Sequence, residues 1–288
     1  MTESVVASFV GWVYRRREPW RSWGEQVRHL ALGLGIERGT GVAWSPREGV
    51  GAVLVDLAVM AAGGVSVFDD GRADLVVATD PAGLAPLLDE GAAIDESEPD
   101  AFERGWQAIG PDDPATLIER LMVTHGALAS AVQSLTVALR VGAHDRVLVG
   151  APPSDATART AGVLLAAVIG AELCVTSSAD FAHALHDWRP TVALAEAAAW
   201  EGADTDACRW PLLLASAPME GPVDAPLHTL WGPPETASVA LFDNHPLPGF
   251  VVFQDSGRLR LRGPDGTLAD LPERTTPRSV STVTNRGN

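Results

Sequence analysis

Residues 229–237 read TLWGPPETA, which places an aromatic residue, a glycine, two prolines and a carboxylate in close succession. Glycine and proline in this arrangement predict a tight, exposed turn. An apolar run just before it, PLLLASA at 211–217, predicts a strand leading toward the turn. Such a turn can present an aromatic face and one acid to a ligand. Taken alone, the pattern is more typical of a turn that only reverses the chain, so the rest of the sequence has to be weighed with it.

The composition is that of a folded acidic protein. The chain has 288 residues, 46% of them hydrophobic and 20% charged, with a formal net charge of −16. This length suffices for one large α/β domain or two small ones. A strongly negative field disfavours binding to nucleic acids or to anionic membranes. All 21 basic residues are arginine, which excludes Schiff-base chemistry on a lysine of this chain.

The N-terminal residues and the two cysteines indicate a cytoplasmic protein. The arginines at 15–17 follow the first apolar stretch, whereas a signal peptide has its basic residues before the apolar ones. No apolar run reaches membrane-spanning length. Cys174 and Cys208 stand in apolar or tryptophan-rich surroundings without metal-ligand spacing. We therefore expect buried thiols in a reducing compartment.

Hydrophobic periodicity predicts a duplicated α/β fold. In both halves a helix, a glycine-containing turn, a valine-rich strand, an Ala/Val/Leu helix and a further strand follow one another, at an offset of about a hundred residues. Apolar strands that alternate with helices predict mainly parallel, buried sheets. The predicted organisation is a core over 1–237, a small antiparallel β subdomain over 238–274 and a disordered tail over 275–288. Within the core, the repeat units are 20–88 and 112–237, and the acidic crossover 89–111 is interpreted as a solvated loop.

The repeat and several short segments make residues 23–262 resemble the N-terminal domain of the adenylate-forming enzymes. This family includes acyl-CoA synthetases, nonribosomal-peptide adenylation domains and luciferases. The similar segments occur in the family's order. They are SWGEQVRHLALGL, VLVDLAVMAAGGVSVF, DDPATLI followed by MVTHGAL, DWRPTVALAEAAAW, LLLASAPM and LWGPPET. LLLASAPM resembles the family's adenine loop, and LWGPPET its aromatic-Gly-x-Thr-Glu motif. The composition, rich in alanine, arginine and valine and free of lysine, is also similar to that of a small actinobacterial family with faint similarity to AMP-binding enzymes.

The resemblance implies a remnant nucleotide site. Its residues are Ser216, Ala217 and Pro218 of the adenine loop, with Trp231, Gly232 and Glu235 of the second motif. Trp231 replaces the usual tyrosine and can still stack on adenine. Glu235 stands where the family has its magnesium-linked carboxylate, so AMP, or ATP with magnesium, is the ligand that the resemblance implies.

Several departures from the family remove the phosphate side of that site. The family's glycine- and hydroxyl-rich phosphate loop lies between the equivalents of Ile118 and Met122, where this chain has only Glu119, Arg120 and Leu121. Pro234 takes the place of the motif's threonine. The stretch PPSDATARTAG, similar to the lining of the family's acyl pocket, has no histidine. The family's ribose-binding aspartate and its lysine-bearing C-terminal domain have no counterpart in the sequence.

Without these groups, little would stabilise a departing pyrophosphate. We therefore expect no catalytic residues and no ordinary acyl-AMP ligase activity. The favoured hypothesis is a non-catalytic relative that binds an adenine-containing ligand or a protein partner. The alternatives are a reduced ligase completed by another chain and a purely structural subunit. The face that a C-terminal domain covers in the family is the expected surface for a partner or for self-association.

Histidines offer two weaker candidates. His183 and His186 are three residues apart beside Asp187, which could form part of a metal site, although a polar helix face is the more typical structure. His125 follows Thr124 at a predicted helix start, where the family also has Thr-His. There we expect a cap and a packing contact rather than a catalytic base.

Overall fold

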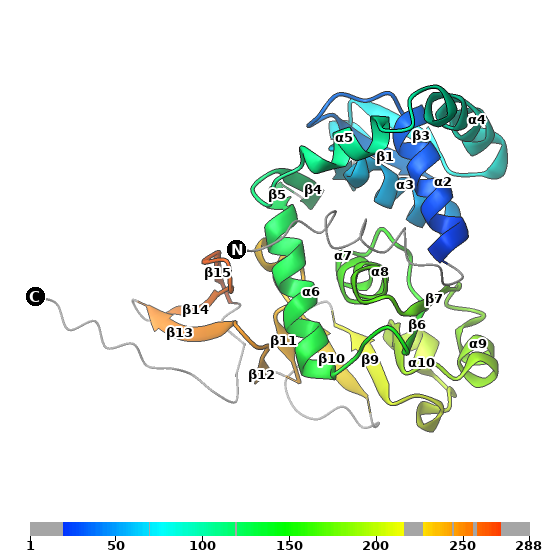
Figure 1. Cartoon of the computed structure of the whole chain (residues 1–288). Helices are drawn as coiled ribbons and strands as arrows, with labels where there is room; N and C mark the ends of the chain where they lie inside the picture. Colours follow the sequence, from blue (N-terminus) through cyan, green and yellow to red (C-terminus); the bar gives the residue numbers. More distant parts are fainter. Residues whose placement is uncertain are drawn as a thin grey trace, which may run out of the picture.

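The structure is a computed structural model. It describes residues 20–68, 70–118, 120–215, 227–243, 245–255 and 258–271. Within these ranges the strands form a five-stranded sheet, a seven-stranded sheet and a separate three-stranded antiparallel sheet (Figure 1). The mixed α/β class, with mainly parallel sheets and a small antiparallel piece near the C-terminus, is confirmed.

The elements up to residue 124 build the five-stranded sheet. They are α2 (Trp20–Gly33), β1 (Gly41–Ser45), α3 (Gly49–Ala61), β2 (Val65–Val67), the 3-10 helix η1 (Asp70–Arg72), β3 (Leu75–Ala78), α4 (Pro81–Ser97), α5 (Ala101–Gln107), β4 (Pro114–Ile118) and β5 (Leu121–Thr124). The strand order is β3-β1-β2-β4-β5. The first four of these strands pair in parallel, and β5 folds back on β4 as an antiparallel hairpin.

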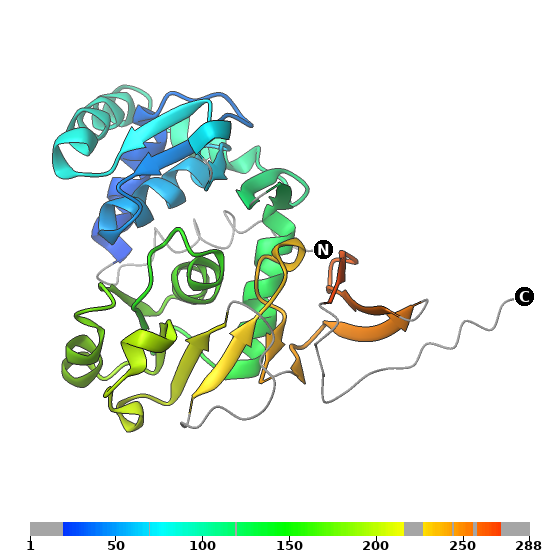
Figure 2. The ribbon, with the colours of Figure 1, turned by 180° about the vertical axis from the view of Figure 1, so that it is seen from behind.

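The next elements build the seven-stranded sheet. They are α6 (His125–Leu139), β6 (Arg146–Val149), α7 (Ala156–Ala158), the π-helix η2 (Arg159–Leu164), α8 (Leu165–Ile169), β7 (Glu172–Val175), α9 (Phe181–Trp188), β8 (Val192–Ala195), α10 (Ala197–Trp200), η3 (Thr205–Ala207), β9 (Trp210–Leu214), β10 (His228–Trp231), η4 (Pro234–Thr236), β11 (Leu241–Phe242) and β12 (His245–Pro246). The order is β12-β11-β10-β9-β8-β6-β7, parallel from β10 to β7. The last three strands, β13 (Val251–Asp255), β14 (Arg258–Arg262) and β15 (Leu268–Asp270), form the antiparallel sheet, set to one side in Figure 2.

The two larger sheets share a local topology that follows the sequence repeat. In the first, β1 lies between β3 and β2, and in the second, β6 lies between β8 and β7. In each case a helix connects the central strand to a parallel neighbour: α3 joins β1 to β2, and the α7–η2–α8 segment joins β6 to β7. The sheets differ at their edges, because β4 and β5, which fall in the second predicted unit, pair with the first sheet.

One apolar core joins both sheets and the antiparallel piece. It includes Val42 of β1, Leu128 of α6, Val149 of β6 and Leu261 of β14. Helix α3 reads GVGAVLVDLAVMA and is buried at every residue from Ala52 to Ala61, as expected of a helix that is apolar all round. Helix α6 runs between the two larger sheets (Figure 1).

The prediction of a solvated acidic loop over 89–111 is wrong, because most of this stretch is helical. Asp80 caps α4 by accepting a hydrogen bond from the Gly83 amide at 2.9 Å. Arg28 of α2 then binds Asp95, with Nη2 2.6 Å from Oδ1, and donates to the Pro99 carbonyl at 2.7 Å. The acidic residues disrupt the apolar periodicity because two of them, Asp95 and Glu103, bind a cation on another helix.

Candidate functional site

Trp231, Gly232 and Glu235 lie at or just after the carboxyl end of β10, where neighbouring parallel strands also end. Trp231 ends β10, and its half-buried indole packs against the main core. The neighbouring strand β9 ends at Leu214, paired in parallel with Leu230. Carboxyl ends of parallel strands are where α/β folds bind ligands. The other predicted residues, Ser216, Ala217 and Pro218, lie outside the described residues.

The turn after β10 is tight, as the sequence predicts, but the prediction that it is exposed is wrong, because Gly232, Pro233, Thr236 and Ala237 are buried. A Cβ on Gly232 would lie 2.5 Å from the Val239 amide nitrogen, so only glycine fits this close approach. Thr236 donates its hydroxyl to the Pro233 carbonyl at 2.9 Å. Ala237 has φ of +56° and Ser238 has φ of +60°, so the backbone forms a left-handed corner at these two residues. The next strand, β11, begins only after this corner. Within the stretch predicted as a β subdomain over 238–274, the first strand thus begins at residue 241 and pairs with β10 of the seven-stranded sheet.

Glu235 lies in the short helix η4, half-buried, next to the hairpin strand β5. Among the described residues no arginine or histidine pairs with its carboxylate, which can therefore accept hydrogen bonds from a ligand. Across the same ranges, no group of three or more His, Cys, Asp or Glu side chains could hold a metal ion. A magnesium ion at Glu235 would thus depend on oxygens from a bound ligand and from water.

The hairpin beside Glu235 is very short. Ile118 pairs with Leu121 across the β4–β5 ladder, so only residues 119 and 120 connect the strands. Arg120 is exposed at this connection. Two residues cannot provide the row of backbone N–H groups that surrounds a triphosphate.

His125 has the cap and packing role predicted from its position. Thr124 accepts a hydrogen bond from the Ala127 amide at 3.2 Å, and the His125 backbone donates to the Asp113 carbonyl at 3.0 Å. The imidazole is fully buried, and neither ring nitrogen has a hydrogen-bond partner. Burial, reinforced by the charge of Arg159, lowers the pKa of His125 to about 4. The ring is therefore neutral near pH 7.

The other titratable candidates show no site geometry. His183 Nε2 lies 3.2 Å from Asp187 Oδ2 on the exposed face of α9. Cys174 and Cys208 are half-buried free thiols, Cys208 donates a hydrogen bond to the Thr205 carbonyl at 3.8 Å, and burial raises the pKa of Cys208 to about 12. These observations agree with a polar helix face and inert thiols.

A buried ion pair that the sequence analysis missed joins the two halves. Arg159 Nε lies 2.6 Å from Asp56 Oδ2, and Nη2 lies 3.0 Å from Oδ1. Ser66 donates to the same Oδ1 at 2.6 Å, and the guanidinium lies over Phe68, 5.5 Å from the ring centroid. Asp56 is the one charged residue of an otherwise apolar helix, which indicates that its buried carboxylate needs a partner. Nothing in the local sequence identifies Arg159 as that partner.

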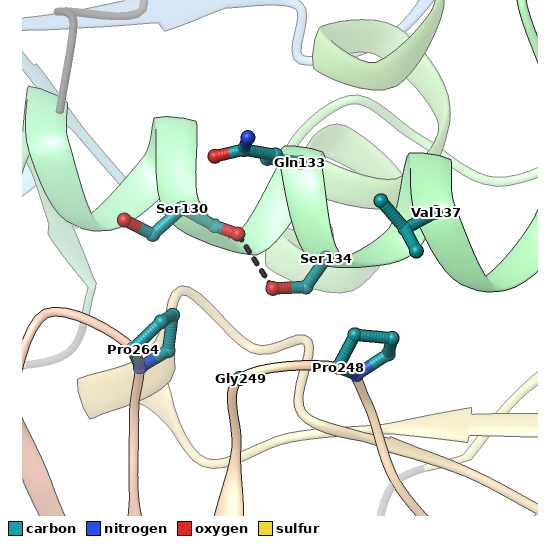
Figure 3. A pocket seen from close by; sticks show the side chains of 7 residues that line it. All are labelled: Ser130, Gln133, Ser134, Val137, Pro248, Gly249 and Pro264. Carbon is teal, nitrogen blue, oxygen red and sulfur yellow. Dashed lines mark hydrogen bonds between the residues drawn. The ribbon is translucent and has the colours of Figure 1, made fainter.

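Two hollows in the described surface lie away from Trp231 and Glu235. One, of about 410 Å³, separates α6 from the Pro248–Gly249 and Pro264 loops (Figure 3). Its floor is polar, with Ser134 Oγ donating to the Ser130 carbonyl at 2.8 Å. The other, of about 500 Å³, lies near the carboxyl ends of β6 and β7.

Comparison with solved structures shows which known fold the chain has. No protein-family model matches the chain, and neither does any curated protein. Solved structures do match. The chain superposes on NpsA-ThdA, an artificially fused adenylation-PCP di-domain NRPS from Klebsiella oxytoca, with a TM-score of 0.71 and 16% identity, over 93% of this chain and 63% of that one. It superposes on the N-terminal domain of FACL13 from Mycobacterium tuberculosis with a TM-score of 0.70 and 15% identity, over 92% of this chain and 90% of that one.

A third match is the anthranilate CoA ligase AuaEII in complex with anthranoyl-AMP, with a TM-score of 0.70 and 11% identity, over 93% of this chain and 70% of that one. The chain has the fold of an adenylate-forming N-terminal domain. In this chain, the turn that carries Trp231 and Glu235 follows β10, and a two-residue connection joins β4 to β5. No helix within the described ranges is long and apolar enough to cross a membrane.

Proposed function

We propose that this chain is a non-catalytic relative of the adenylate-forming enzymes, which binds an adenine-containing ligand or a protein partner. The observation that carries the proposal is the two-residue connection between β4 and β5. Adenylate formation needs cations and N–H donors around the departing pyrophosphate. Arg120 is the one cation at this connection, in a protein of net charge −16.

The adenine side of the site supports ligand binding. Trp231 offers an indole face at the carboxyl end of β10, and Glu235 follows one turn later. AuaEII, which has the same fold, holds anthranoyl-AMP. Base stacking on an aromatic side chain contributes about 1–3 kcal/mol. AMP is therefore the simplest ligand for the remnant site, and magnesium should add little to its affinity.

Calorimetric titration with AMP and ATP, each with and without magnesium, tests the proposal. We expect AMP to bind and ATP with magnesium to bind no more tightly. Trp231→Ala should weaken AMP at least about fivefold, whereas the control Trp188→Ala, which removes a half-buried tryptophan on α9, should not. Acid-dependent ATP–pyrophosphate exchange above the level of a Glu235→Ala variant would overturn the non-catalytic assignment. Failure of AMP to bind would leave a protein partner as the ligand class.

One observation favours a second candidate, a reduced ligase that another chain completes. Arg120 is exposed on the hairpin whose strand β5 packs against η4, the short helix that carries Glu235. Pyrophosphate release that appears only on mixing with a partner, and that is lost in Arg120→Gln, would support this alternative. Absence of release with any partner tested would count against it.

A further inference from the structure

The larger hollow lies between the two halves of the chain. Its lining comes from Glu48 and Gly49 at the start of α3, from residues 151–153 after β6 and from residues 175–178 around the end of β7. Its volume of about 500 Å³ is within the range of small-molecule sites. Both this hollow and the turn at Trp231 lie at the carboxyl ends of parallel strands of the seven-stranded sheet. The hollow is near β6 and the turn follows β10, and strands β8 and β9 lie between them. At about 4.8 Å per strand spacing, the two sites are about 14 Å apart.

The serine hydroxyls of this hollow can only accept hydrogen bonds from a ligand. Ser178 Oγ donates to the Gly150 carbonyl at 3.1 Å, and Ser177 Oγ donates to Asp180 Oδ2 at 2.7 Å. A hydroxyl has one donor and two acceptor lone pairs, so both serines have used their donor on the protein. A ligand that meets these oxygens must bring N–H or O–H groups.

Glu48 is the one charged residue of the lining. It occupies the N-cap position of α3, yet its side chain makes no capping hydrogen bond and is exposed. The adjacent Arg47 is engaged elsewhere, donating from Nη1 to the Phe68 carbonyl at 2.5 Å. Gly49 has φ of +78°, and a Cβ there would meet no atom within 4 Å, which leaves the space beside Glu48 open. No described cation pairs with the Glu48 carboxylate.

Apart from Gly49 and the hydroxyl-bearing Thr176, the remaining wall is apolar, formed by Ala151, Pro152, Pro153 and Val175. We propose that this hollow binds a small organic ammonium ion. Its N–H groups donate to Glu48 and to the Ser178 oxygen, and its hydrocarbon part packs on the two prolines. The partial positive charge at the start of α3 favours anions, but Glu48 already provides the negative charge there. The net charge of −16 raises the local concentration of cations.

Calorimetric titration of the whole chain with n-butylammonium chloride at low ionic strength tests this site. We expect saturable binding at one site per chain, with no saturable binding of the uncharged 1-butanol. Glu48→Gln keeps the shape of the side chain and removes its charge, and should weaken butylammonium at least about tenfold. Ser178→Ala should weaken it by a smaller factor. The matched control is Glu201→Gln, an exposed glutamate after α10, which should leave the affinity unchanged.

Two results would overturn the inference. One is that the wild type and Glu48→Gln bind butylammonium with equal affinity. This includes the case in which neither protein binds it although circular dichroism shows that both are folded. The other is saturable binding of inorganic phosphate that strengthens in Glu48→Gln, which would identify the start of α3 as an anion site. The AMP titration is independent of this test, because Glu48 lies outside the turn at Trp231.

Discussion

Replacing Arg159 by methionine tests the ion pair that joins the two halves of the fold. Arg159 is 0% exposed and Asp56 1% exposed, and two hydrogen bonds of 2.6 and 3.0 Å connect them. Methionine fills much of the same volume without the charge, so the Asp56 carboxylate would keep only its hydrogen bond from Ser66. Removing one partner of a buried pair costs about 3–5 kcal/mol. Domains have about 5–15 kcal/mol of stability, so the variant should unfold much more easily.

Urea unfolding followed by circular dichroism measures this loss. The double variant Arg159→Met with Asp56→Leu should recover at least about 2 kcal/mol, because two apolar side chains can replace a buried ion pair. Arg104→Met is the matched control. Its pair with Glu98 is also close, at 2.9 Å, but the two side chains are 62% and 63% exposed. Its loss should stay below about 1 kcal/mol. A loss below about 1 kcal/mol in Arg159→Met, or a double variant no more stable than the single one, would refute the reasoning.

Four further variants test the packing and the charges of the fold. The pKa of His125 is lowered to about 4 from a usual 6.5, so the unfolded chain takes up a proton first as the pH falls. Wild-type stability should therefore drop by up to about 3 kcal/mol between pH 6.5 and 4, and His125→Leu should flatten that part of the urea-unfolding profile. Gly91→Ala would place a Cβ 1.7 Å from the His29 carbonyl oxygen, where α4 meets α2, and should lower the melting temperature through a cost of about 1–3 kcal/mol. Gly105→Ala adds a methyl group that meets no atom within 4 Å, so this variant should raise the melting temperature slightly. Equal effects of Gly91→Ala and Gly105→Ala on the melting temperature would contradict this description of the packing. Asp80→Ala removes the cap of α4 and should cost about 1 kcal/mol in urea unfolding, and no change would mean that the cap is unimportant.

Much of the architecture is visible in the sequence because it depends on local spacing. The repeated order of helix, glycine turn and valine-rich strand predicts both parallel sheets, and turn residues such as Gly232 predict the sharp corner before Glu235. The short connection between β4 and β5 is also visible, because the number of residues between Ile118 and Met122 limits its length whatever the fold.

Other features depend on partners that are distant along the chain. The acidic residues near Asp95 indicate a solvated loop until Arg28, 67 residues earlier, is placed against them. Asp56 and Arg159 are 103 residues apart, and Glu48 meets residues 151–153 and 175–178 only where the two halves pack.

The sequence by itself thus determined the repeated α/β order outside residues 89–111, the resemblance and the short connection between Ile118 and Met122. The tertiary structure alone decided which buried charges pair and where a carboxylate faces an open hollow. The physical reason is that helix and strand periods arise from neighbours within a few residues. Burial and charge pairing arise from side chains that only the packed core brings into contact.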